Sequence, residues 1–213
     1  MPQAFFSFIL DEAVDFNEKA FAISVLQQGD RLMNYRKKDP SQKFDPSRFN
    51  IVLFTAAGEF VNARFGSHFT FSLLNQKITL NAGKYYFMVD PIWNTSTDNA
   101  EEYKEVLIDI YGPRAVDIEP VSDAEGMEHL SRAFKHAAKT KNLEKQYYLE
   151  DNEDYGRNVT RISDIKSLGC WYGFIHTQND SPYAMTETLR LDLTGLEVAH
   201  PKPNSGSDFN FTI

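Results

Sequence analysis

The stretch NAGKYYFMVDP, residues 81–91, decides the expected fold of this chain. Side chains alternate between the two faces of a strand, and both faces of this one are apolar: Tyr85, Phe87 and Val89 on one, Tyr86 and Met88 on the other. A strand that is apolar on both faces belongs in the middle of a packed β-sandwich. Gly83 lacks a Cβ and lets the chain reverse into the strand. The Asp90-Pro91 step is expected to end its pairing, because proline has no N–H to donate.

Short runs of strand character lie on both sides of this stretch and are separated by turn residues. They are AFFSFIL (4–10), AFAISVLQ (20–27), FNIVLF (49–54), HFTFSLL (68–74) and EVLIDIYG (105–112). Strands at this spacing, with no helix between them, favour antiparallel pairing. The sequence therefore predicts a mainly β protein with an antiparallel β-sandwich over residues 1–120.

Residues 121–145 change to a helical pattern. Ser122 and Glu125 have the spacing of a capping box. Apolar residues then recur at helical intervals: Met127, Leu130, Phe134, Ala137 and Ala138. The pattern predicts one amphipathic α-helix from about residue 123 to 141, and we expect its apolar stripe to pack onto the sheet edge.

Residues 146–213 are expected to hold an acidic linker and a C-terminal β segment. The linker is YYLEDNEDYG (147–156), and the strand candidates are GCWYGFIHT (169–177), TETLRLDLTGLEV (186–198) and SDFNFTI (207–213). The last of these is expected to lack a neighbour, so it could pair with the sheet of a partner protein.

The charge of the chain limits the classes of partner that it is expected to bind. The 213 residues carry a formal net charge of −8, which disfavours nucleic-acid binding because phosphate backbones are negative. Between Arg31 and Arg48, however, positive charges exceed negative ones by four. We expect the basic loop, defined by Arg36, Lys37, Lys38 and Lys43, to bind an acidic partner such as a phospholipid surface or an acidic polypeptide; a merely solvated loop is the alternative.

Cysteine content and hydropathy indicate the expected cellular compartment of the protein. A single cysteine fits a reducing compartment. No apolar run approaches the roughly 20 residues that span a bilayer. A cytoplasmic protein without a transmembrane helix is therefore expected.

The stretch SLGCWYGFIH, residues 167–176, raises the question of thiol chemistry. A thiol protease needs a histidine beside the thiolate and a third group that orients the imidazole. Cys170 and His176 are six residues apart on one expected strand, which separates them by about 20 Å. We therefore expect a buried structural cysteine, no catalytic residue and no enzyme. A cysteine-type, peptidase-like hydrolase that uses Cys170 is the alternative.

Metal and carbohydrate sites are weaker interpretations. The five histidines are scattered, so they are interpreted as surface residues and no metal ligand is assigned. An acidic cluster raises calcium as an alternative: Asp98, Glu101, Glu102 and Glu105. A solvated acidic loop, with no cofactor, is the expectation. A carbohydrate-binding sandwich would instead use Trp93, Tyr85 or Tyr86 as exposed stacking platforms.

Two ordered motifs within residues 4–112 resemble a known family. The first is a strand that ends in Gln27 and is followed by Gln28, Asp30 and Arg31; the second is a Leu-x-x-Gly-x-Tyr turn made by Leu80, Gly83 and Tyr85. Together they resemble domain III, the β-sandwich module that calpains carry after their protease domains, here without the protease core. DPIWN (90–94) looks like a divergent calpain-like subgroup, and residues 186–198 with 207–213 look like the start of a second, partial module.

The resemblance implies a role without catalysis. In calpains this module links catalytic and calcium-sensing parts and is associated with electrostatic switching and acidic phospholipids. It therefore implies a regulatory or scaffolding module that binds protein partners within a larger assembly, with calcium or phospholipid binding as the alternative. Such modules also serve as scaffolding in ciliary microtubule structures, which implies a cytoskeletal or ciliary location.

Overall fold

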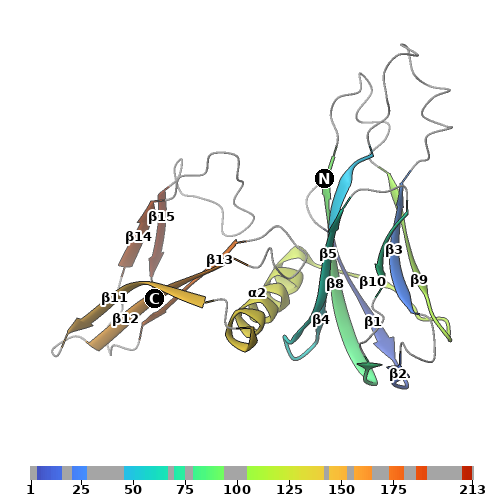
Figure 1. The fold of residues 1–213 in the computed structure, drawn as a ribbon, viewed down its shortest axis with the longest axis horizontal. Coiled ribbons are helices and arrows are strands. Elements are labelled where there is room, and N and C mark those ends of the chain that lie inside the picture. Colours follow the sequence, from blue (N-terminus) through green and yellow to red (C-terminus); the bar gives the residue numbers. More distant parts are fainter. Residues whose placement is uncertain are drawn as a thin grey trace, which may run out of the picture. The chain divides into compact units, whose positions relative to one another are not determined.

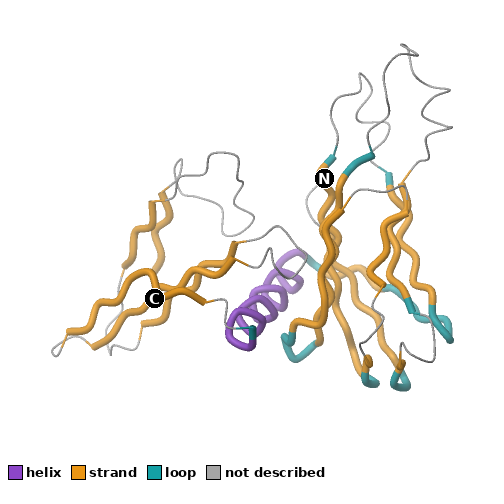
Figure 2. Tube along the Cα trace, in the orientation of Figure 1, coloured by secondary structure: helices purple, strands orange, loops and turns teal. Residues whose placement is uncertain are grey.

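The computed structural model describes residues 4–15, 21–27, 46–66, 70–74, 79–93, 105–141, 144–152, 156–164, 173–179, 186–190 and 208–212. These residues form a mainly β protein with antiparallel sheets and one α-helix (Figures 1 and 2). They divide into two compact units, one that ends at Ala137 and one that begins at Ala138. The mainly β, antiparallel class predicted from the sequence is confirmed.

The first unit contains a five-stranded sheet with the order β10-β1-β8-β4-β5. The strands are β10 (Glu119–Val121), β1 (Ala4–Leu10), β8 (Gly83–Ile92), β4 (Arg48–Thr55) and β5 (Phe60–Gly66). The central strand β8 pairs with β1 from Gly83 to Val89 and with β4 from Tyr85 to Ile92. The stretch that the sequence placed in the middle of the fold therefore lies in the middle of the larger sheet.

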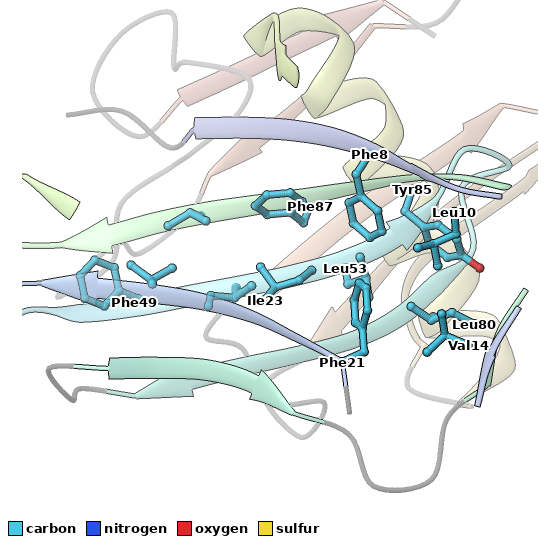
Figure 3. Close-up of a cluster of buried hydrophobic side chains, with 13 residues drawn as sticks. Phe8, Leu10, Val14, Phe21, Ile23, Phe49, Leu53, Leu80, Tyr85 and Phe87 are labelled. Carbon is cyan, nitrogen blue, oxygen red and sulfur yellow. The ribbon is translucent and has the colours of Figure 1, made fainter. Parts of the chain in front are cut away.

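A second sheet in the same unit has the order β6-β3-β9. Its strands are β6 (Thr70–Leu74), β3 (Ala22–Gln27) and β9 (Val106–Tyr111), and a short pair is formed by β2 (Val14–Asp15) and β7 (Thr79–Leu80). Both sheets and the short pair contribute side chains to one hydrophobic cluster (Figure 3). Its members include Phe8, Phe21, Ile23, Phe49, Leu53, Leu80 and Phe87. This cluster is the core of the unit.

Aromatic rings fill much of this cluster. The ring of Phe87 stacks on that of Phe6 with centroids 5.2 Å apart, and the ring of Phe8 stacks on that of Tyr85 at 5.5 Å. The Tyr85 hydroxyl donates a hydrogen bond of 2.9 Å to the Asn81 carbonyl, which gives a buried polar group its partner. Burial raises the pKa of the Tyr85 hydroxyl, because the phenolate is poorly solvated there.

The two predicted faces of β8 are confirmed. Tyr85, Phe87 and Val89 enter the cluster, and Tyr86 and Met88 are buried on the opposite face. Gly83 has a φ of +146°, a conformation that side-chain-bearing residues rarely adopt. The expected stop at Pro91 is wrong on the side of β4, where pairing continues to Ile92; pairing with β1 is described as far as Val89, opposite the first described residue, Ala4. Proline lacks one N–H group, and pairing toward a neighbour that does not use that group can continue past it.

The helix α2 (Asp123–Thr140) begins and ends within one residue of its predicted limits. It covers the face of the five-stranded sheet opposite the cluster, rather than the sheet edge. A Cβ on Gly126 would lie 2.1 Å from Cγ of Phe5 in β1, and the imidazole of His129 stacks on the ring of Tyr86 in β8 at 4.3 Å. The reason is that β1, β4 and β8 are apolar on both faces, so the second face also needs cover.

The predicted capping box forms only in part. The Glu125 N–H donates to the Ser122 hydroxyl at 3.4 Å. The Glu125 carboxylate accepts a hydrogen bond of 2.9 Å from the Tyr86 hydroxyl, so it ties the first turn of the helix to the sheet.

The turn between β4 and β5 contacts the same helix. Gly58 has a φ of +80°, and its N–H donates to the Thr55 carbonyl at 2.9 Å. A Cβ at this position would lie 2.6 Å from Cβ of Arg132. Gly58 is therefore required twice, by the backbone conformation and by the close approach of α2.

The second unit is also built from antiparallel strands. A three-stranded sheet has the order β11 (Glu144–Asn152), β12 (Gly156–Asp164) and β13 (Gly173–Asn179), and β14 (Thr186–Arg190) pairs with β15 (Asp208–Thr212). Two expectations change. Most of the supposed acidic linker lies in β11, and a polar composition is compatible with an antiparallel strand. The supposedly unpartnered C-terminal strand, β15, pairs with β14.

Candidate functional site

The predicted site residues Arg36, Lys37, Lys38 and Lys43 lie outside the described residues. The chain on both sides of them is described: β3 ends at Gln27, and β4 begins at Arg48. The candidate site is therefore built from the residues that hold the two ends of this basic segment.

Gln27 and Ser47 close the segment with a pair of hydrogen bonds. The Gln27 side-chain amide donates to the Ser47 carbonyl at 3.0 Å, and its carbonyl oxygen accepts from the Ser47 N–H at 2.9 Å. The side chain thus satisfies both backbone groups of Ser47, as a neighbouring strand would. Gln27 comes from the three-stranded sheet, whereas Ser47 directly precedes β4 of the five-stranded sheet, so the bonds link the two sheets at this end.

The end of β8 lies beside this closure. Asn50 of β4 is opposite Asp90 of β8, and its side-chain amide donates to the Asp90 carboxylate at 3.0 Å. The Trp93 ring meets the ring of Phe49 edge-on, with centroids 6.1 Å apart. These contacts fix the course of the chain where it leaves β8.

Two segments of opposite charge connect strands at this end of the sheets. Gln27 lies opposite Val106, and Arg48 lies opposite Ile92, so residues 28–45 and 94–104 both link strands here. Positive charges exceed negative ones by two in residues 28–45, and negative charges exceed positive ones by two in residues 94–104. The sequence therefore places an excess of opposite charge in these two connecting segments.

The carbohydrate alternative is wrong for the two tyrosines. Tyr85 and Tyr86 are buried, so neither offers a ring face for a sugar. Trp93 is half-buried and packs against Phe49. Within the described part of the chain its buried Nε1 has no hydrogen-bond partner.

The expected surface position of the helical histidines is also wrong. His129 and His136 are half-buried, and the Nδ1 atom of each is buried. His129 lies on the ring of Tyr86, and the ammonium group of Lys84 lies 5.0 Å from the centre of the same ring. The sequence signal was their seven-residue spacing, which repeats a helix face but does not say whether that face is covered.

Other predicted site residues lie partly outside the described chain. Cys170, Asp98, Glu101 and Glu102 are outside it, and His176 is placed in β13 opposite Arg161 without a description of its side chain. Among the side chains that are described, no three histidine, cysteine, aspartate or glutamate residues come together as a metal-ligand set. In the same residues, no helix has the length and hydropathy that crossing a membrane requires.

Substitution of Gln27 tests the closure. We expect Gln27→Ala to lower the free energy of unfolding by about 1–3 kcal/mol, because two partly buried backbone groups of Ser47 lose their partner. Gln27→Glu keeps an acceptor for the Ser47 N–H but places a second oxygen against the Ser47 carbonyl. Protonation of that glutamate restores a donor, so urea unfolding should show the Glu variant approaching the native protein below about pH 4. An Ala variant as stable as the native protein would contradict the assignment.

Sequence reasoning marked Gln27 as part of a motif, but it gave the side chain no role and did not find its partner. Ser47 follows a proline and carries no catalytic or binding signature, and it lies 20 residues away in sequence. Comparison of the chain with protein-family models, with curated proteins and with solved structures finds no match, so the resemblance to calpain domain III stays a prediction.

Proposed function

We propose that residues 1–120 form a calpain domain III-like β-sandwich that, with the added helix, acts as a non-catalytic interaction module with a regulatory or scaffolding role. The sandwich is supported by the single hydrophobic cluster to which both sheets contribute. The module binds an acidic polypeptide segment through the basic loop.

The observation that carries this proposal is the Gln27–Ser47 closure. It holds together the two ends of the segment that contains Arg36, Lys37, Lys38 and Lys43. Closed ends reduce the number of conformations open to the segment, so less entropy is lost when its cations meet a partner. A concentration of positive charge in a chain with a net charge of −8 also steers acidic partners toward one place.

A role without catalysis is supported by what the polar side chains of this unit do. Gln27 bonds to Ser47, Asn50 to Asp90, and Tyr86 to Glu125. Each of these contacts joins two parts of the chain itself. These three polar contacts of the described residues therefore serve the architecture.

Removal of three basic residues tests the proposal. We expect Arg36→Ser, Lys37→Ser and Lys38→Ser together to weaken binding to a fluorescent poly-glutamate peptide about tenfold at low salt, because three charge pairs of the strength typical of a protein surface would be lost, at roughly 0.5 kcal/mol each. The salt dependence of the remaining binding should be flatter. Fluorescence anisotropy over a range of salt concentrations measures both effects.

The matched control removes the same charge elsewhere. Lys135→Ser, Lys139→Ser and Lys141→Ser change the net charge equally at the end of α2, and this variant should bind the probe like the native protein. Equal weakening in both variants would show that only net charge matters and would contradict a site.

Vesicles of phosphatidylserine and phosphatidylcholine replace the peptide in a second experiment. Binding to the vesicles but not to poly-glutamate would assign the loop to a membrane surface instead.

A further inference from the structure

The strand β9 forms an edge of the three-stranded sheet. It pairs with β3 from Ala22 opposite Tyr111 to Gln27 opposite Val106, without a register shift. In the described part of the chain no strand pairs with its other side. An edge strand directs every second N–H and C=O group away from its sheet, where another strand can bond to them.

The side chains of β9 alternate in burial. Val106, Ile108 and Ile110 pack against the core cluster. Leu107 and Tyr111 point the other way and are 63% and 64% exposed. These are the two most exposed of the large apolar side chains that the structure describes.

Carboxylates alternate with these apolar groups on the outer face. Glu105 and Asp109 are exposed and share this face with Leu107 and Tyr111 by the two-residue period of a strand. Leu26 of β3 lies opposite Leu107 and extends the apolar surface onto the next strand. Acidic and apolar side chains therefore alternate on this face along β9.

The strand lacks three of the devices that protect exposed edges. Natural edge strands are often blocked by lysine, by proline or by a bulge; residues 106–111, VLIDIY, contain none of these, and their one charged residue is Asp109. By contrast β10, the corresponding edge of the five-stranded sheet, is three residues long and contains Pro120.

We propose that β9 is a docking strand for an extended peptide of a partner protein, whose outward side chains alternate between lysine or arginine and apolar residues. The peptide adds a fourth strand beside β9. Its cations face Glu105 and Asp109, and its apolar groups cover Leu107 and Tyr111. This surface is independent of the basic loop and selects a partner of the opposite charge.

Charge argues for this occupant over a second copy of the chain. Antiparallel self-pairing centred on Asp109 would place two Asp109 carboxylates opposite each other, centring on Leu107 would place Glu105 opposite Asp109, and centring on Ile108 would leave each Asp109 opposite Leu107 without a cation to pair with. Like charges directly opposite each other in a sheet are destabilising. Each copy also carries a net charge of −8, so two copies repel each other.

A designed probe tests the proposal on the full-length chain. The probe is a fluorescein-labelled seven-residue peptide with valine and lysine alternating on one face and threonine and valine on the other. We expect it to bind native protein at least about tenfold more tightly than a scrambled peptide of the same composition, because only the ordered peptide places each side chain against its counterpart. We also expect amide hydrogens of residues 106–111 to exchange more slowly when it is bound.

Charge reversal on the strand gives the matched variant. Asp109 is exposed, so Asp109→Lys should leave the thermal unfolding temperature unchanged. It should weaken the binding of the lysine peptide about tenfold. The same variant should bind a peptide with glutamate in place of lysine more tightly than the native protein does. Recovery with the exchanged peptide would show direct pairing of charges on this strand.

Three outcomes would overturn the proposal. Equal binding of the ordered and scrambled peptides would reduce the effect to attraction between net charges. Unchanged exchange of the β9 amides would place the peptide elsewhere. A native chain that sediments as a dimer, and as a monomer after Leu107→Lys, would make a second copy the occupant. The variant that lacks Arg36, Lys37 and Lys38 separates the two proposals: it should bind the lysine peptide at least as well as the native protein, whether or not the basic loop binds poly-glutamate.

Discussion

Replacing Gly126 by alanine is expected to destabilise the first unit by about 2–4 kcal/mol, although alanine is the better helix former. In an exposed helix the change from glycine to alanine would raise the free energy of unfolding by roughly 1 kcal/mol. Here a Cβ would lie 2.1 Å from Cγ and 2.5 Å from Cδ2 of the Phe5 ring. Both atoms belong to a buried ring near its own backbone, so the helix must shift, and overpacking of this kind typically costs about 1–3 kcal/mol or more.

Two further variants show whether the loss comes from this contact. Ala124→Gly makes the reverse change at an exposed position of the same helix, and it should cost roughly 1 kcal/mol or less. Glycine would then be worse at position 124 and better at position 126. Phe5→Ala removes the ring, so the Gly126→Ala and Phe5→Ala double variant should lose less stability than the sum of the two single variants. Urea unfolding monitored by circular dichroism measures the four variants and the native protein. A Gly126→Ala protein at least as stable as the native one would show that α2 does not rest on Phe5.

The second large effect is expected for Phe87→Ala. The ring is fully buried in the centre of β8, stacks on Phe6 at 5.2 Å and lies 6.0 Å from the ring of Phe8. Truncation of such a phenylalanine costs about 3–5 kcal/mol through lost burial and the cavity that remains. We expect the urea midpoint of the first unit to fall by the corresponding amount, or the unit to fail to fold.

Graded substitutions separate packing from a general loss of folding. Phe87→Leu keeps most of the volume and should cost clearly less than Phe87→Ala. Ile9→Ala, at an exposed position in the neighbouring strand β1, should change stability by about 0.5 kcal/mol or less. If Phe87→Ala were as mild as Ile9→Ala, the two sheets could not share the core that Phe87 fills.

The alternation of apolar and polar residues explains why much of the first unit could be predicted. β1 coincides with its predicted range, and β4, β8 and β9 differ from theirs by one or two residues at an end. The helix was predictable because Ser122 and Glu125 mark its start and an apolar stripe follows. These signals are local, and each is repeated over several residues.

The missed elements lack such local signals. β5 contains Asn62, Arg64 and Gly66, and β10 has three residues including Pro120. β11 carries Glu150 and Asp151, so its composition is that of a loop. The position of α2 on the face of the sheet follows from the second apolar face of β1, β4 and β8, which becomes visible only once those strands are neighbours.

The same distinction between local signals and contacts of distant residues applies to the candidate site. Sequence alone indicated the basic residues, which lie outside the described residues, and marked Gln27 only as part of a motif, with no role for its side chain. It could not indicate that Gln27 bonds to Ser47, because a hydrogen bond across 20 residues depends on how two sheets meet. It also directed attention to the C-terminal strand, whereas β15 has a neighbour and β9 has an exposed edge. An edge is a property of strand order, which alternation within one strand does not determine.

The closure by Gln27 has a consequence for how this scaffold can vary. In the described part of the chain, the Gln27 side chain, and not a ladder of strand pairs, joins the two ends of residues 28–46. The entropy of closing a loop rises by only about 0.6 kcal/mol for each doubling of its length. Insertions, deletions or grafted recognition sequences between Gln27 and Ser47 should therefore lower the free energy of unfolding only slightly. Related chains are expected to vary in length and sequence there while both sheets stay the same.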